Sequence, residues 1–223
     1  MAALITSLIP QQNFESVRNA IGAILAVEMA NQYTLYEGTS PAPAFPYPNI
    51  NKCYVERIVP YDLKELPAIN VSVDSAEWSY QSIVKRDGVV TFNIDIDVSS
   101  TGAPSSMSGN QFSGYLMQKI AGLVAAILSN QVYLSGGGPV GPLGFPPGFI
   151  GYVLIKRLMV MERSELMTDD NLSTVRGRIQ VDVKILENNF GNSANPVPLS
   201  TVMSKVLLTD DEFGFLIEIT GLS

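Results

Sequence analysis

The sequence predicts an α+β fold: an antiparallel β-sheet with two helices packed on one face, plus extended loops and arms. Three observations predict it. Two stretches carry apolar residues at helical spacing, several stretches alternate apolar and polar residues, and turn-like segments join neighbouring strands directly instead of through crossover helices. At 223 residues the chain is expected to form a single domain over 1–223, with its core at about 13–186.

The first helix is expected from Asn13 to Gln32, where apolar residues recur every three or four positions and Asn13 can act as the N-cap. The segment 37–51 contains EGTSPAPAFPYPN, whose prolines remove backbone donors. It therefore reads as an extended, proline-rich arm. A short β-rich run is expected from Lys52 to Pro60.

The next strands are expected to form a hairpin. LPAINVSV, from Leu66 to Val73, alternates as a strand does. Asp87-Gly88 is a tight-turn signal between SYQSIVKR and VVTFNIDIDVSS. The second run puts five apolar side chains on one side of a strand, and its other side carries Asn93, Asp95 and Asp97.

A second helical stripe runs from Phe112 to Leu128. The Gly/Pro loop that follows, at 135–151, is too apolar for a solvated linker, so Leu143, Phe145 and Phe149 are expected to rest on other residues. Two long strands come next, at 152–163 and 175–186, and Arg178 lies on the polar side of the second. The C-terminal extension, 187–223, carries one or two short strands that form a sheet edge or an arm reaching a neighbour.

Composition argues against most chemistry. The chain has no histidine, which removes the commonest general base and metal ligand. Its formal charge is −7, without a basic run, so specific nucleic-acid binding is not expected. The lone Cys53 reads as a buried structural thiol. The N-terminus lacks the basic start of a signal peptide and no long apolar span occurs, so a product of the cytoplasm without membrane contact is expected.

Asn93, Asp95 and Asp97 allow three interpretations: a metal cage, a carboxylate pair for acid/base chemistry, or the solvent-facing side of a strand. An EF-hand loop counted from Asn93 would need glycine and glutamate where Val98 and Pro104 stand. Carboxylates two apart on a strand lie about 6.5–7 Å apart, which suits a two-carboxylate hydrolase or a magnesium site. Because any solvent-facing strand has that spacing, a solvated or interface face is the favoured interpretation.

No other motif supports an enzyme or a cofactor. Gly136, Gly138 and Gly141 match G-x-G-x-x-G in letters, but a helix is expected before them and prolines follow, whereas the dinucleotide motif needs a strand before and a helix after. No Walker lysine, G-x-S-x-G or C-x-x-C occurs. The prediction is a protein that works by assembling, with no catalytic, metal or cofactor residues.

The order of elements from Asn13 to Leu186 resembles that of the tail terminator proteins of long-tailed bacteriophages. The most family-like piece is the Leu66-Pro67-Ala68-Ile69-x-Val71 stretch. The proline-rich arm, the Gly/Pro loop and the C-terminal extension look like additions. The topology is shared with other virion ring proteins, so another neck, tail-completion or baseplate ring protein is the alternative within this class. A carboxylate-dependent hydrolase is the alternative from another class.

The resemblance implies a homo-oligomeric ring, usually a hexamer, in the tail or neck of a virion made in the cytoplasm of a host bacterium. Such a ring binds the tail tube protein, stops tube polymerisation and docks the head–tail connector or neck proteins, with the sheath protein as a further partner where the tail contracts. DNA passes through such a ring. The family has no catalytic residue. The candidate interface or channel-facing residues here are Asn93, Asp95, Asp97, Leu143, Phe145, Phe149 and Arg178, and the aspartates would present acid to passing DNA.

Overall fold

The structure, a computed structural model, describes residues 11–39, 47–50, 52–82, 85–99, 107–135, 140–165, 173–188, 205–207 and 215–218. Its helical elements are α1 (Asn13–Glu37), η1 (Leu63–Glu65), α2 (Gly109–Leu128), α3 (Gln131–Leu134) and η2 (Pro142–Gly144). Its strands are β1 (Cys53–Val55), β2 (Ala68–Ser82), β3 (Lys85–Ser99), β4 (Ile150–Glu165), β5 (Ser173–Asn188), β6 (Lys205–Leu207) and β7 (Phe215–Glu218).

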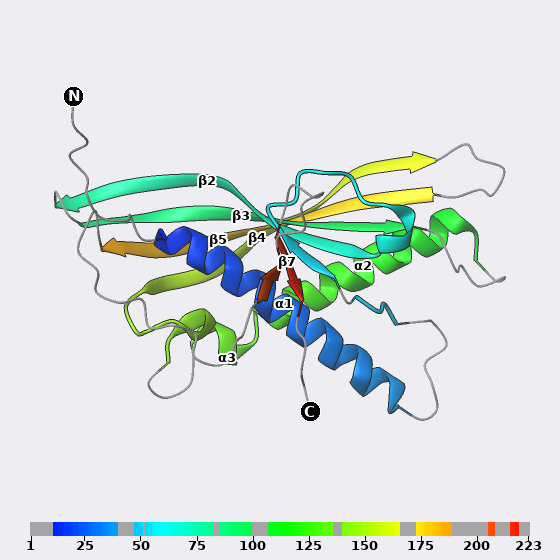
Figure 1. The fold of residues 1–223 in the computed structure, drawn as a ribbon, viewed down its shortest axis with the longest axis horizontal. Coiled ribbons are helices and arrows are strands. Elements are labelled where there is room, and N and C mark those ends of the chain that lie inside the picture. The colour runs from blue at the N-terminus through cyan, green and yellow to red at the C-terminus, as the bar shows by residue number, and fades with distance from the viewer. Residues whose placement is uncertain are drawn as a thin grey trace.

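The strands form one sheet in the order β4-β5-β3-β2-β1-β7-β6, with β2, β3, β4 and β5 as its long members (Figure 1). The predicted α+β class is confirmed. The sheet is mixed, however, and not purely antiparallel, because β1 pairs with β2 in parallel. The chain between Val55 and Ala68, which includes η1, returns to the starting end of β1 and so allows that parallel pair.

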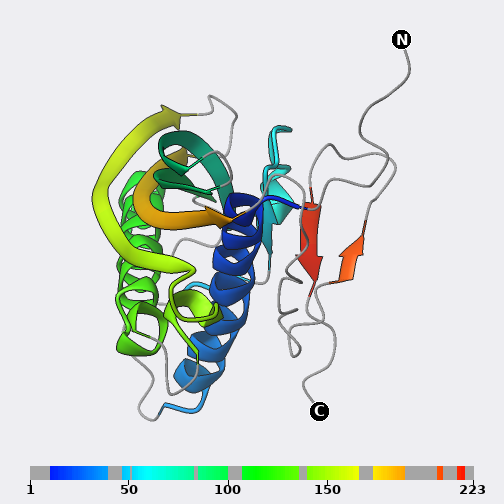
Figure 2. The same cartoon turned by 90° about the vertical axis from the view of Figure 1, so that its left-hand side faces the viewer.

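Both long helices pack on the apolar face of the sheet, as the sequence predicts (Figure 1). Alternate residues of β3 and β5 meet buried residues of α1 and α2 in one core. In the side view β4 and β5 bend strongly while the helices stay straight (Figure 2). Three register shifts along β4 against β5 account for part of that bend, since each extra residue in a strand increases its local twist.

The helix starts differ from the predicted ones by a few residues. Gln12, not Asn13, is the N-cap of α1, and its backbone N–H donates to Glu15 Oε2 at 2.8 Å. Asn13 instead donates from Nδ2 to the backbone carbonyl of Leu186 at 2.7 Å, which ties the helix to the end of β5. The second helix, α2, is capped by Ser108, whose Oγ accepts the backbone N–H of Gln111.

The predicted hairpin of β2 and β3 is present, but the position predicted for its turn is wrong. Asp87 and Gly88 lie inside β3, paired with Ser79 and Trp78 of β2. A Cβ at Gly88 would lie 2.3 Å from the backbone oxygen of Glu77 and 2.5 Å from Cε3 of Trp78. Glycine is therefore needed here for a close approach of the neighbouring strand and not for a turn.

The described part of the Gly/Pro loop packs into the chain's own core. Leu143 is 1% exposed and Phe145 is 8% exposed. Phe145 stacks on Phe149 with ring centroids 4.6 Å apart. The expectation that these apolar residues rest on other residues is met within the subunit, which leaves little of Leu143 or Phe145 for a neighbour.

The arm and the C-terminal extension are described only in part. Residues 40–46 and 51 of the arm lie outside the described residues, but Tyr47 stacks on Tyr36 of α1 with centroids 5.0 Å apart. Cys53 is buried, as predicted, and burial raises the pKa of its thiol to about 12. In the extension, β7 pairs with β1, which makes this piece a sheet edge; residues 189–204, 208–214 and 219–223 lie outside the described residues.

Candidate functional site

The candidate site is the face of β3 and β5 that points away from the helices, which we call the polar ladder. It consists of Asp74, Thr91, Asn93, Asp95, Asp97, Arg157, Arg176, Arg178, Gln180 and Asp182. Its polar residues stand at every second position of each strand, so the register that buries the apolar face also sets the polar side chains of β3 opposite those of β5.

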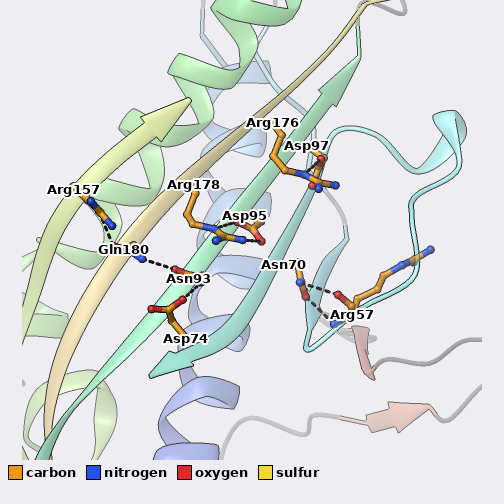
Figure 3. A network of polar contacts seen from close by, with 10 residues as sticks. All are labelled: Arg57, Asn70, Asp74, Asn93, Asp95, Asp97, Arg157, Arg176, Arg178 and Gln180. Atoms are coloured by element: carbon orange, nitrogen blue, oxygen red, sulfur yellow. Dashed lines mark hydrogen bonds and ion pairs between the residues drawn. The ribbon is translucent and has the colours of Figure 1, made fainter. Parts of the chain in front are cut away.

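Two arginine–aspartate pairs form the strongest rungs (Figure 3). Arg178 donates from Nε to Asp95 Oδ1 at 2.5 Å and from Nη2 to Asp95 Oδ2 at 2.8 Å, a bidentate contact. One rung along, Arg176 Nε donates to Asp97 Oδ1 at 2.6 Å. The hydrogen bond to Asp95 raises the pKa of Arg178 above its ordinary value. Both aspartate side chains are largely buried, at 14% and 13% exposure.

A chain of neutral and charged contacts crosses all four long strands beside these pairs (Figure 3). Arg157 of β4 donates to Gln180 Oε1 at 2.7 Å, Gln180 donates to Asn93 Oδ1 at 3.0 Å, and Asn93 donates to Asp74 Oδ1 of β2 at 2.8 Å. Asn93 and Gln180 are buried. Their amides each use a donor and an acceptor in this chain of bonds, so burial leaves neither side chain unsatisfied.

The far end of the ladder adds contacts from Thr91 and from two lysines. Thr91 Oγ1 donates to Asp182 Oδ1 at 2.7 Å, and Lys156 of β4 lies 3.3 Å from the other oxygen of Asp182. Lys184 pairs with Asp87 at 3.0 Å. The acids of this face come mainly from β2 and β3 and the bases from β4 and β5, so charge changes sign across the sheet.

A group of residues in and after β1, which we call the loop clamp, lies beside the polar ladder; it consists of Tyr54, Arg57, Tyr61 and Glu65. Arg57 lies over the rings of Tyr54 and Tyr61, at 4.3 and 4.7 Å from their centroids, and its guanidinium contacts Glu65 at 2.9 Å. Asn70 of β2 accepts the backbone N–H of Arg57 at 3.0 Å, which attaches the clamp to the sheet (Figure 3). Burial raises the pKa of Tyr61, and the nearby negative charge of Asp97 raises it further.

Glu65 is the acid of this clamp. Burial alone would raise its pKa, but hydrogen bonds from Tyr54 and Arg57 outweigh that effect and lower the pKa of Glu65 to about 2. The Tyr54 hydroxyl donates to Glu65 Oε1 at 2.7 Å. The clamp therefore depends on an ionised glutamate.

The geometry favours a structural face over a metal or acid/base site. Asp95 has both oxygens engaged by one guanidinium, and Asp97 is held by another, so neither carboxylate points into an open site. Among the residues that the structure describes, no group of three or more metal-binding side chains is gathered in one place. A hydrolase needs two carboxylates that are free to act on a substrate, and Asp95 and Asp97 are both bound to arginines.

The structure brings four of the seven predicted residues together and separates the others. Asn93, Asp95, Asp97 and Arg178 share the polar ladder, whereas Leu143, Phe145 and Phe149 lie around η2 and pack against the core on the helix side. Sequence reasoning missed the roles of Arg176, Gln180 and Arg157. The alternation of charges along 175–186 was the available signal, but it does not say which strand lies alongside.

No protein-family model matches the chain, and no curated protein matches its sequence. None of the helices in the described ranges combines the length and the apolar character that crossing a bilayer requires.

Proposed function

We propose that this chain is a structural subunit that assembles into a ring, and specifically a tail terminator that caps the tail tube of a long-tailed bacteriophage. The observation that carries the proposal is the edge strand β4. It has 16 residues, it is the last strand of the sheet, and no other strand in the described part of the chain pairs with its outer edge.

The β4 edge combines open backbone with exposed apolar side chains. Tyr152, Leu154, Leu158 and Val160 are 42%, 55%, 52% and 46% exposed. A long edge strand with such residues is a site for pairing with another chain, and soluble monomers usually protect such edges. A closed ring buries edges of this kind on every subunit.

The polar ladder also supports a structural role. Its residues hold four long strands together by contacts within the subunit, and its acids face arginines. If this face lines the bore of a ring, it offers passing DNA a polar wall of paired charges, and this replaces the earlier expectation of an unpaired acidic wall. Arg178, with the partly exposed Asp95 and Asp97, keeps its proposed place at that wall or at an interface, whereas Asn93 is buried.

The partners follow from the proposed role. The ring would bind the last ring of the tail tube protein on one side, stop further polymerisation there, and dock head–tail connector or neck proteins on the other. In a contractile tail the sheath protein would meet it as well. The working place would be the tail or neck of the virion.

Electron microscopy and size measurement of the full chain, alone and with tail tubes, test the proposal. We expect rings, and we expect capped tube ends that no longer grow when tube protein is added. Rings that leave tube growth unchanged would point to another neck, tail-completion or baseplate ring protein. A chain that stays monomeric and binds no tube end would refute the proposal.

A further inference from the structure

We propose that neighbouring subunits join edge to edge: residues 150–157 of β4 in one copy pair, antiparallel, with residues 74–82 of β2 in the next. The sheet then continues from subunit to subunit around the ring. This inference rests on the proposed function in one respect, that copies of the chain form a ring, and it names the surfaces that meet.

Within the described residues, no strand pairs with the outer edge of β2 over the required length. β1 pairs with β2 only at Ile69, Asn70 and Val71. Just beyond these pairs, the carboxylate Oε1 of Glu56 accepts the backbone N–H of Val73 at 2.8 Å, which ends the hydrogen bonding between β1 and β2. From residue 74 onward, the described residues supply no strand on the outer side of β2.

Strand direction favours this joint. The order β4-β5-β3-β2 consists of antiparallel neighbours throughout, so β4 and β2 run in opposite directions. A copy placed beside the first by rotation about a ring axis sets its β2 next to β4 of the first. The new pair is then antiparallel, like every pair within these four strands, and it is heterologous, as ring closure requires.

Charge favours it as well. The open stretch of β2 carries exposed Asp74 and Glu77, whereas β4 carries exposed Lys156 and Arg157. Acids of β2 facing bases of β4 would repeat between copies the arrangement that holds β3 to β5 within one copy. Complementary charge of this kind selects the partner and its register.

Side-chain size agrees with charge. Residues paired on successive strands form rows across the sheet, from β4 through β5 and β3 to β2. One row contains Leu154, Asp182, Thr91 and Ser75, and another contains Tyr152, Lys184, Val89 and Glu77. On β4 the ends of these rows carry exposed Tyr152 and Leu154. On β2 the residues at 75, 76 and 79 are Ser75, Ala76 and Ser79, all small and exposed, so large apolar side chains of β4 meet a strand with room for them.

The same residues argue against a symmetric β4–β4 dimer. The middle of Ile150–Glu165 falls between Arg157 and Leu158. Antiparallel pairing of two β4 strands about that point would bring Arg157 close to its own copy, and like charges placed together oppose association.

Cysteine cross-linking of the full chain tests the joint. Leu154→Cys and Glu77→Cys place thiols on the same face of the two edges. The native Cys53 is buried with its thiol pKa raised to about 12, so it gives little background at neutral pH. With a short bismaleimide, we expect the double variant to give a ladder of covalent oligomers. A mixture of the two single variants should stop at dimers, and each single variant alone should stay uncross-linked.

A charge-reversal series provides the matched second measurement. Asp74→Lys and Arg157→Glu, at positions that face each other when 150–157 pairs antiparallel with 74–82, are each expected to weaken self-association by roughly tenfold, and the double variant to recover most of it. Lys64→Glu changes an exposed charge away from both edges and should leave self-association unchanged.

The outcomes separate this inference from the proposed function. Rings that form normally while the double cysteine variant gives no ladder and the charge reversals have no effect would overturn the edge pairing and leave the terminator proposal standing. Dimers from Leu154→Cys alone would replace it with a symmetric β4 contact. A wild-type chain that is monomeric with and without tubes would overturn both.

Discussion

The two faces of β3 and β5 are made from alternate residues of the same strands, yet they are specified differently. On the helix side Phe92, Ile94 and Ile96 are fully buried among other apolar residues. On the other side Asp95 has one bidentate partner, Arg178, and Asn93 has one amide partner, Gln180. The apolar face needs volume and burial, whereas the polar face needs particular partners in a particular register.

The two faces therefore make different contributions to the stability and the specificity of the fold. Burial of apolar area is non-directional, so the helix side supplies most of the stability and tolerates exchanges of similar size. Hydrogen bonds and ion pairs are directional and leave a costly group behind when one partner is lost. The polar ladder therefore adds specificity to the register that burial of the apolar face sets. Four measurements test this difference between the two faces.

The largest effect is expected on the apolar face. Ile94→Ala removes a fully buried side chain and should lower the free energy of unfolding by about 2–5 kcal/mol, because it loses apolar burial and leaves a cavity. Chemical denaturation measures this loss. Val89→Ala, on the opposite face of the same strand, is the matched control and should cost far less. Equal losses would mean that the two faces are equally buried in solution.

The next effect concerns the strongest rung of the polar ladder. Arg178→Met leaves the largely buried Asp95 without its guanidinium and should cost about 1.5–3 kcal/mol. A double-mutant cycle with Asp95→Asn should give a coupling energy of about 1–3 kcal/mol, measured by denaturation. If the losses in unfolding free energy from the two changes simply add, Arg178 and Asp95 do not interact specifically, and this face behaves like any solvent-exposed surface.

The third effect tests the close approach of β2 to β3. Gly88→Ala should destabilise the protein by about 1–3 kcal/mol, since the added Cβ would lie 2.3 Å from a backbone oxygen that cannot move freely. Gly114→Ala in α2, where nothing lies within 4 Å of the new Cβ, should instead stabilise it by about 0.5–1 kcal/mol. If both changes behave alike, the strand separation at Gly88 is wrong.

The smallest effect is a pH dependence at the loop clamp. The pKa of Glu65 is about 2 in the folded chain against an ordinary value of 4.5, so its contribution is present above pH 4.5 and is lost as pH falls toward 2. Glu65→Gln should be less stable at neutral pH and lose less on acidification. Denaturation curves from pH 6 to pH 2.5 measure this. Parallel pH profiles for the two proteins would argue against the clamp.

Much of the fold could be predicted because it depends on local pattern. Strict alternation from Val90 to Val98 sufficed to predict a half-buried strand, and helical spacing sufficed for both long helices, with ends correct to a few residues except at the C-terminus of α1. The hairpin turn was misplaced because Asp-Gly is a turn signal in isolation. At Gly88 the close approach of Trp78 across the hairpin accounts for the glycine.

The sequence alone predicted which faces of β3 and β5 are polar, that Cys53 is buried, and that the apolar part of the Gly/Pro loop rests on other residues. Three features depend on the three-dimensional fold: Asp95 meets Arg178 and Asp97 meets Arg176, Leu143 and Phe145 fill the subunit's own core, and β1 runs parallel to β2. The physical reason is distance along the chain. Alternation acts between near neighbours, whereas these rungs join residues 83 and 79 positions apart, and their pairing follows from the order and register of the strands.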